Sequence, residues 1–340
     1  MATLGATVLT LADWAKRLDP DGKVPSIVEL LGQTNEILTE MLFKEGNLPT
    51  GDRTTVRTGL PTVAWRLLNK GVAKSKSTTA QIDEACGMLE GRCEIDKDLA
   101  DINGNTSAYR LSEAQAFIEA MNQEMASTLF YGNSGTAPEE FTGLAPRYAS
   151  TTANNGSNVL SAGGTGADNT SVWLVAWGAN TCYGVFPKGS KAGLIHEDLA
   201  LGDAFDSDNN RFRAYMDRWQ WKCGVALRDW RYVVRIPNID ISDLLALGTT
   251  QATTAATFLP KLMARSIDRI PAPGLGRMAF YANRTVMSNL RVAAMEKTIN
   301  TLAIQDGINQ FGQKIQSGLT FLGIPVRMCD ALIESEGAVS

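Results

Sequence analysis

The feature that most constrains this chain is a stretch of extended, basic sequence at residues 46–80. Threonine, valine and tryptophan, which favour strands, recur through it, and Gly59-Leu60-Pro61 interrupts them. This pattern predicts a long, exposed β-hairpin. An isolated hairpin has little core of its own, so we expect it to need a partner surface. The simpler alternative is an ordinary solvated hairpin.

Basic side chains are concentrated in the same stretch, although the chain as a whole has a net charge of −4. Such side chains can meet acidic surface on a partner, where complementary charge sets orientation more than raw affinity. The basic residues of this stretch are Arg53, Arg57, Arg66, Lys70, Lys74 and Lys76.

Two capping boxes mark predicted helix starts. The first, Ser26–Glu29, is followed by apolar residues at helical spacing until Gly46, which is a suitable helix end. The second, Ser112–Gln115, is followed by apolar residues at intervals of three and four. It predicts a helix over residues 112–131, about 30 Å long.

The rest of the chain indicates a mixed α+β fold, without an internal repeat and without a linker that clearly splits it. Strands are indicated by valine, tyrosine and tryptophan runs, and helices by apolar residues on one face. Strands are predicted at 172–177, 182–186, within 212–236, at 278–282 and around Gly323 in 319–328, helices near 96–102 and at 259–270 and 284–296, and a surface loop at 150–171.

No motif in the sequence assembles a catalytic or cofactor site. His196 is the only histidine, which excludes a multi-histidine metal site and favours a hydrogen-bonded or surface role. Gly163–Gly166 lacks the lysine ending of a phosphate loop, and Gly274–Ala279 precedes a predicted strand instead of opening a helix. The acidic stretches 94–98 and 206–208 read as solvated loops. We therefore predict no catalytic residue, cofactor or metal ion.

Net charge, the length of apolar runs and the cysteine pattern each argue against certain partners or surroundings. A net charge of −4 and a pI of about 5.3 argue against tight nucleic-acid binding, which relies on a basic surface. No run approaches the ~20 apolar residues of a membrane span, and the N-terminus lacks the basic region of a signal peptide. The five cysteines are odd in number and include no C-x-x-C pair, so we expect reduced thiols in a cytosol.

Four stretches, in this order and spacing, resemble a known family. They are Ser112–Asn133 with Phe141–Tyr148, then Val185–Leu194, Arg228–Ile236 and Phe321–Val326. The chain resembles tailed-bacteriophage major capsid proteins of the Hong Kong 97 fold, and is most similar to coat proteins of epsilon-fifteen-like podophages. The resemblance covers roughly residues 23–335.

The resemblance implies a fold with four parts. They are an N-terminal arm at 1–45, an extended loop (the β-hairpin) at 46–80, a peripheral domain at 81–239 and 318–340 with a spine helix at 112–131 and a long sheet, and an axial α/β domain at 240–317. In the family the extended loop overlies a neighbouring subunit, so the resemblance implies that the basic residues of this loop lie at a subunit interface; they are Arg53, Arg57, Arg66, Lys70, Lys74 and Lys76.

It also implies a structural protein, not an enzyme. Hexamers and pentamers of the chain would form an icosahedral shell in the virion, assembled in the host bacterial cytoplasm around double-stranded DNA that it contacts non-specifically. A separate scaffolding protein is expected, because the stretch ahead of the resemblance is short for a built-in scaffold. A portal protein and a decoration protein would be further partners, and no membrane is involved.

Two alternatives stand beside this interpretation. The first is the shell protein of a cellular nanocompartment of the same fold, an encapsulin, which would co-purify with a cargo enzyme. The second is a soluble enzyme of unknown type, for which the motif search offers no residue.

Overall fold

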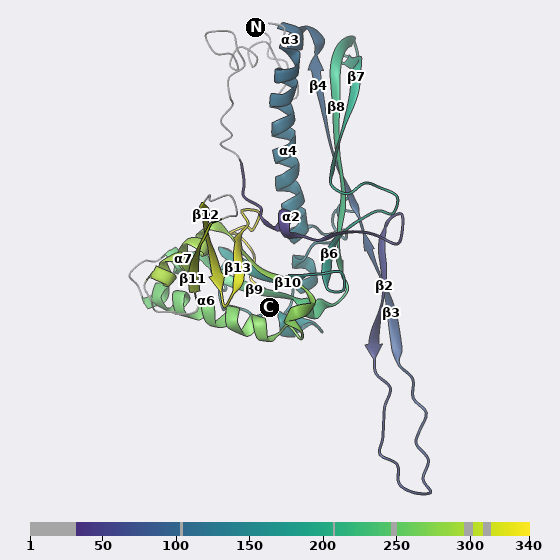
Figure 1. Cartoon of the computed structure of the whole chain (residues 1–340), viewed down its shortest axis with the longest axis vertical. Coiled ribbons are helices and arrows are strands. Elements are labelled where there is room, and N and C mark those ends of the chain that lie inside the picture. Colours follow the sequence, from purple (N-terminus) through teal and green to yellow (C-terminus); the bar gives the residue numbers. More distant parts are fainter. Residues whose placement is uncertain (1–31, 103–104, 207, 246–249, 296–301, 309–313) are drawn as a thin grey trace.

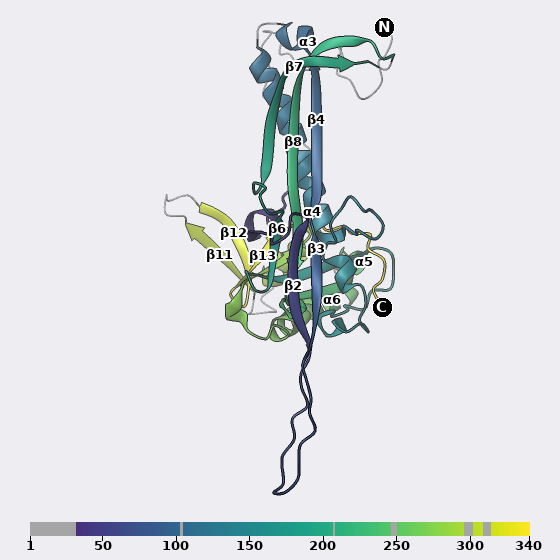
Figure 2. The same ribbon diagram turned by 90° about the vertical axis from the view of Figure 1, so that its right-hand side faces the viewer.

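The computed structural model describes the whole chain except residues 1–31, 103–104, 207, 246–249, 296–301 and 309–313. The described part is elongated. A mixed α/β body carries a tall layer with the longest helix on one side, and a thin hairpin projects away in the opposite direction (Figure 1, Figure 2).

The body is organised around β5 (Asn169–Trp177), which is buried along its whole length. It pairs antiparallel with β9 (Val233–Asp240) and with β10 (Arg277–Ala282). Successive side chains of a strand point to opposite faces. Leu174 therefore belongs to one hydrophobic core and its neighbour Trp173 to another.

Helices cover both faces of this sheet. The core that contains Leu174 is closed by α5 (Ile241–Leu245), α6 (Thr250–Asp268) and α7 (Arg284–Met295). The core that contains Trp173 is closed by the C-terminal half of α4 (Thr106–Tyr131).

The tall layer consists of α4 beside three long strands. β8 (Arg211–Leu227) pairs antiparallel with β4 (Gly87–Asp96) on one edge and with β7 (Leu194–Phe205) on the other. Its last residues pair with β6 (Cys182–Phe186), which joins this layer to the body. Phe117 of α4 stacks on Trp219 of β8, with 4.9 Å between ring centroids.

Shorter elements complete the chain. The body sheet is extended by β11 (Leu302–Ile308), β12 (Lys314–Phe321) and β13 (Ile324–Met328). β13 pairs parallel with β10 and antiparallel with β12, and β12 pairs with β11. β1 (Phe43–Glu45) pairs parallel with β6. The remaining helical elements are α2 (Ile37–Glu40), α3 (Lys97–Asp101) and 3-10 turns at Ala145–Tyr148, Gly156–Asn158, Trp230–Tyr232 and Pro273–Leu275.

The α+β class and most predicted elements are confirmed. The long helix is present, but it begins at Thr106, six residues before the predicted start. Ser112 lies inside this helix, and its hydroxyl donates to the carbonyl of Tyr109 at 2.8 Å. The capping box at Ser112 is therefore a wrong prediction, because the hydroxyl satisfies a carbonyl of the preceding turn instead of an amide.

Two further predictions need correction. The helix predicted from Ser26 to Gly46 is reduced, among the described residues, to the single turn α2, and Phe43–Glu45 is a strand (residues 26–31 lie outside the described part). The surface loop at 150–171 is partly interior. The Asn158 amide is buried and donates to the carbonyl of Val233 at 3.0 Å, and β5 already begins at Asn169.

Candidate subunit interface

The projecting hairpin is built from β2 (Gly51–Gly59) and β3 (Thr78–Ala85). They pair antiparallel from Gly51 opposite Ala85 to Gly59 opposite Thr78. Pro61 has no amide hydrogen for a ladder, which fits the end of pairing near this point. Residues 60–77, here called the distal loop, continue outward without strand structure (Figure 2). The predicted hairpin is confirmed, although its ladder is shorter than expected at the tip and reaches Ala85 at the base.

The predicted interface residues fall into two groups. Arg53 lies near the base, where its guanidinium binds both carboxylate oxygens of Asp83 across the ladder, each at 2.6 Å. It is therefore engaged within the chain, which the sequence did not indicate. The other five are exposed and make no ion pair with any described residue; they are Arg57, Arg66, Lys70, Lys74 and Lys76.

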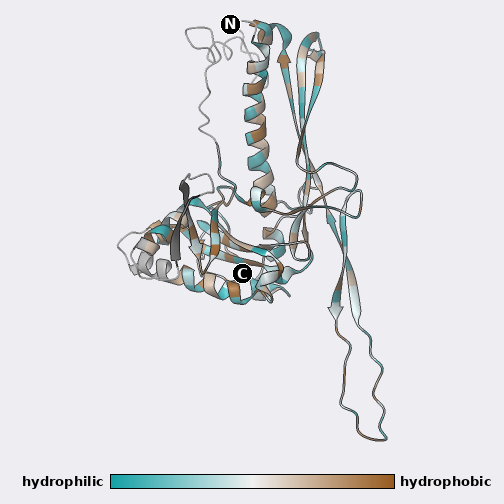
Figure 3. Cartoon of the chain, in the orientation of Figure 1, coloured by the Kyte–Doolittle hydropathy of each residue, from teal (hydrophilic) through white to brown (hydrophobic). Residues whose placement is uncertain are grey.

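Large apolar side chains are exposed along the distal loop, and sequence reasoning did not single them out as interface residues. Trp65 is fully exposed, at 104%, and Leu68 is 93% exposed. Val63, Leu60 and Leu67 follow at 87%, 81% and 69%. Figure 3 marks this loop with hydrophobic residues in brown. A concentration of exposed apolar surface at the end of a projection is typical of a contact site, because water around it is costly.

The hairpin is anchored to the body by two buried carboxylates, here called the root. Asp52 of β2 and Glu84 of β3 lie directly opposite each other in the ladder. The guanidinium of Arg147 donates to both carboxylate oxygens of Glu84 at 2.6 Å, and also to the carbonyls of Thr142 and Gly143. Arg147 thus ties β3 to the segment that follows α4.

Asp52 is held by a different set of groups. The hydroxyl of Tyr183 and the amide of Asn47 donate to it, and the guanidinium of Arg228 lies 3.5 Å away. Burial raises the pKa of Asp52, but the hydrogen bonds from Tyr183 and Asn47 together with the Arg228 guanidinium outweigh burial, and the pKa is lowered. The charged carboxylate therefore stabilises the root above the usual carboxyl range, and that contribution is lost as pH falls through the lowered pKa.

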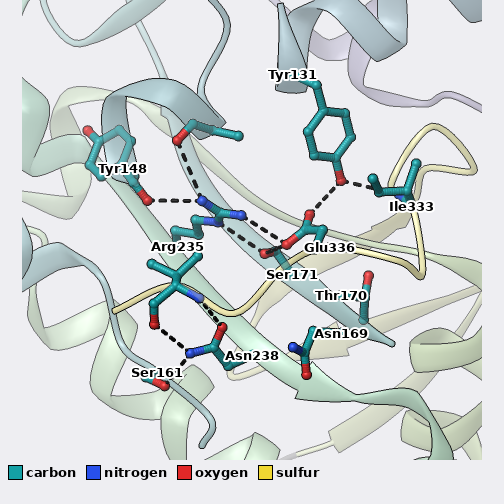
Figure 4. A network of polar contacts seen from close by, with 12 residues as sticks. Tyr131, Tyr148, Ser161, Asn169, Thr170, Ser171, Arg235, Asn238, Ile333 and Glu336 are labelled. Atoms are coloured by element: carbon teal, nitrogen blue, oxygen red, sulfur yellow. Dashed lines mark hydrogen bonds and ion pairs between the residues drawn. The ribbon is translucent and has the colours of Figure 1, made fainter. Parts of the chain in front are cut away.

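A second buried network fastens the C-terminal segment to the body (Figure 4). Arg235 of β9 donates to Glu336 at 2.9 Å, and both side chains are 5% exposed. Ser171 and Tyr131 also donate to this carboxylate. Burial and Glu336 raise the pKa of Tyr131, so its hydroxyl stays a donor. In this network the donors meet acceptors and the ion pair is buried. Such a network is suited to fixing the C-terminal segment against the body.

His196 has a partner that the sequence did not indicate. Its Nε2 lies 2.9 Å from Asp217, and its ring stacks on Trp219. The expectation of a hydrogen-bonded or surface histidine is confirmed, because the side chain is half exposed and also paired.

Among the described residues there is no group of three or more potential metal ligands, and no described helix is long and apolar enough to span a membrane.

Comparison with known proteins decides the family. A family profile described as "Major capsid protein GP7" matches residues 19–340. This chain belongs to that family. The capsid protein is also similar to a solved structure of bacteriophage Epsilon15, with 31% identity, a TM-score of 0.76, and coverage of 100% of this chain and 99% of that chain.

More distant matches include the capsid of bacteriophage JBD30, at 10% identity and a TM-score of 0.49 over 89% of this chain and 92% of that chain. An encapsulin from Synechococcus elongatus matches at 10% identity and a TM-score of 0.42, over 68% of this chain and 97% of that chain. Both TM-scores are below 0.5, so neither match supports an argument about this chain. Comparison with curated protein sequences found no significant match.

The capsid protein is therefore a structural component of the virion of a tailed bacteriophage, not an enzyme. The resemblance to epsilon-fifteen-like coat proteins is confirmed. Membership in this family sets aside the soluble enzyme, and the family description names a major capsid protein, not a nanocompartment shell.

Proposed function

We propose that the hairpin is the segment by which one capsid subunit contacts the adjacent copy. The observation that carries this proposal is the exposed apolar surface of the distal loop, in which Trp65 is the most exposed side chain. A buried root holds the hairpin away from the body, so the tip has no core within its own subunit. Covering it against a neighbouring copy removes this surface from water, at roughly 25 cal/mol per Å² of apolar area.

Charge supports the same role. Residues 54–82 hold five basic residues and no acidic one. The rest of the chain then carries 27 basic and 36 acidic residues, a net charge of −9. A basic arm on an acidic protein is attracted to other copies of that protein, and opposite potentials fix the orientation of contact. Arg57, Arg66, Lys70, Lys74 and Lys76 supply this charge.

The proposed division of the subunit is the one that the resemblance implies. The N-terminal arm is 1–45, of which residues 1–31 lie outside the described part, the extended loop is 46–80, the peripheral domain is 81–239 with 318–340, and the axial domain is 240–317. Head-to-tail contacts close into rings, and hexamers and pentamers of this kind build an icosahedral shell around double-stranded DNA. The acidic body favours weak, non-specific contact with that DNA. A scaffolding protein, a portal protein and a decoration protein complete the partners.

A charge-reversal variant tests the arm. Arg57, Arg66 and Lys70 are changed to Glu together; Arg53 is left alone because it pairs with Asp83 within the hairpin. The matched control changes Lys188, Lys191 and Lys261 to Glu, which are also exposed and give the same change in net charge.

Shell yield is measured by sedimentation and electron microscopy, and folding by circular dichroism. We expect the hairpin variant to stay folded and lose assembly, while the control assembles. Equal shell yields from the hairpin variant and the unmodified chain would overturn the proposal, as would equal losses in variant and control.

A further inference from the structure

The tall layer has one long strand edge that lacks the usual protection against pairing. Among the described residues β4 pairs only with β8, so its other edge presents backbone amide and carbonyl groups that no strand meets. Figure 2 shows this edge on the side of β8 away from β7. The ladder between β4 and β8 runs from Gly87 opposite Cys223 to Asp96 opposite Ala214 without a register shift. β4 is 10 residues long and contains no lysine or proline, the residues that commonly protect an edge.

The opposite edge of the same layer is different. β7 also pairs only with β8 among the described residues, but its ladder is shifted between Asp198 and Leu201, where Ala200 has a positive φ of 61°. Such a bulge bends and twists a strand, which makes its edge a poor template for a further strand. The regular β4 is therefore the edge of this layer that is suited to pair with another chain.

We propose that the free edge of β4 pairs antiparallel with β4 of a second copy of the chain, across a two-fold axis at Gly91. A two-fold contact uses the same patch on both copies. Copies in one shell turn the same face outward, so α4 must lie on the same side of both sheets. Residues that meet across the axis then come from the same face of β4, because side chains alternate between the two faces. This contact is separate from the hairpin, and it joins two subunits directly instead of closing a ring.

Charge selects the register of this contact. The exposed face of β4 carries Glu90, Arg92 and Glu94, so its charges alternate in sign along the strand. With Gly91 opposite Gly91, Glu90 of each copy faces Arg92 of the other, which gives two pairs of opposite charge. Moving the axis to Arg92 would place Arg92 against Arg92 and Glu90 against Glu94, and moving it to Glu90 would place the two Glu90 carboxylates together. Opposite charges directly across a ladder stabilise it and like charges destabilise it, which favours the axis at Gly91.

The side chains are placed for this exchange. Arg92 is 66% exposed, and its ion pair within the subunit is with Glu90 of its own strand at 2.9 Å. Arg218 of β8 also binds Glu90, at 2.7 Å. Glu90 therefore stays held when Arg92 turns to the Glu90 of the facing copy. The contact replaces one exposed ion pair within each subunit by a pair between subunits and adds backbone hydrogen bonds along the edge.

Disulfide trapping tests the register directly. The full chain is prepared as Glu90→Cys and as Arg92→Cys, and shells are assembled from each variant alone and from an equal mixture. Residues that face each other across an antiparallel ladder have Cβ atoms about 5 Å apart, close enough for a disulfide after small adjustments. After oxidation, we expect covalent dimers in the mixed shells and few in either single-variant shell, because position 90 faces position 92 and not itself. Mixed shells with no more dimer than the single-variant shells would overturn the inference.

A charge reversal supplies a second measurement. Arg92→Glu places a carboxylate opposite Glu90 twice in each contact, whereas Arg213→Glu makes the same change beside the bulged edge, where Arg213 is 56% exposed and pairs with Asp203 at 2.9 Å. We expect both variants to stay folded by circular dichroism, and shell yield to fall severalfold for Arg92→Glu alone. Equal yields from the two variants would overturn the charge-paired register. Neither residue is among those changed in the hairpin variant, so this outcome and that of the proposed function can be told apart.

Discussion

Removing the guanidinium of Arg147 tests whether the root sets the position of the hairpin. Arg147→Met keeps the aliphatic stem and removes the groups that donate to Glu84, Thr142 and Gly143. The Glu84 side chain is only 8% exposed, so its charge would remain buried without a partner.

The expected cost is about 3–5 kcal/mol, the range found when one partner of a buried ion pair is removed. The loss should concentrate at the root. Amide hydrogens of β2 and β3 should exchange faster, and a protease should cut the hairpin sooner, because the anchored end can then detach. Chemical unfolding of the unassembled subunit, followed by tryptophan fluorescence, measures the global part of the effect.

The hairpin supplies its own matched control. Arg53 binds Asp83 with the same two-point geometry and the same 2.6 Å distances, but both side chains are about half exposed. Arg53→Met should therefore have a much smaller effect, because water and salt screen exposed pairs. Replacing Arg147 and Glu84 together by Met and Leu should cost less than the sum of the single changes. If Arg147→Met were no more harmful than Arg53→Met, burial at the root would not be what holds the hairpin.

Three further predictions concern other parts of the chain. Glu336→Ala leaves Arg235 buried without its carboxylate and should cost about 3–5 kcal/mol in chemical unfolding, whereas a midpoint equal to that of the unmodified chain would show that the C-terminal network contributes little. Gly143→Ala would place a Cβ 2.6 Å from the Thr128 carbonyl oxygen and should destabilise the subunit by about 1–3 kcal/mol. Gly71→Ala is the neutral control, because there is open space around Gly71. Equal unfolding midpoints for the two variants would refute the steric argument. Burial, and secondarily Asp52, raise the pKa of Cys86 to about 11, so its labelling by a thiol reagent should be slow at pH 8 and rise about tenfold per pH unit toward that pKa; a plateau near pH 9 would contradict this.

The hairpin and the long helix were predictable because each rests on local signals. Strand-forming threonines and the break at Gly59-Leu60-Pro61 are visible in sequence, and so is the helical period that ends at Tyr131. The exposed role of Trp65 was not, because tryptophan favours strands whether it is buried or not.

The anchoring contacts were beyond sequence reasoning for a different reason. Arg147 and Glu84 are 63 residues apart, and Arg235 and Glu336 are 101 apart. Nothing local marks either pair, since only the folded topology brings them together. Tertiary contacts also override local preference at Phe43–Glu45, where pairing with β6 makes a strand of a segment with a helical pattern.

The most direct test of the central claim is a cryo-electron microscopy reconstruction of particles assembled from the full chain. The account predicts an icosahedral shell in which the distal loop of each subunit lies against an adjacent copy, with Trp65 covered. A shell whose distal loops project into solvent, or a preparation of small discrete oligomers only, would contradict it.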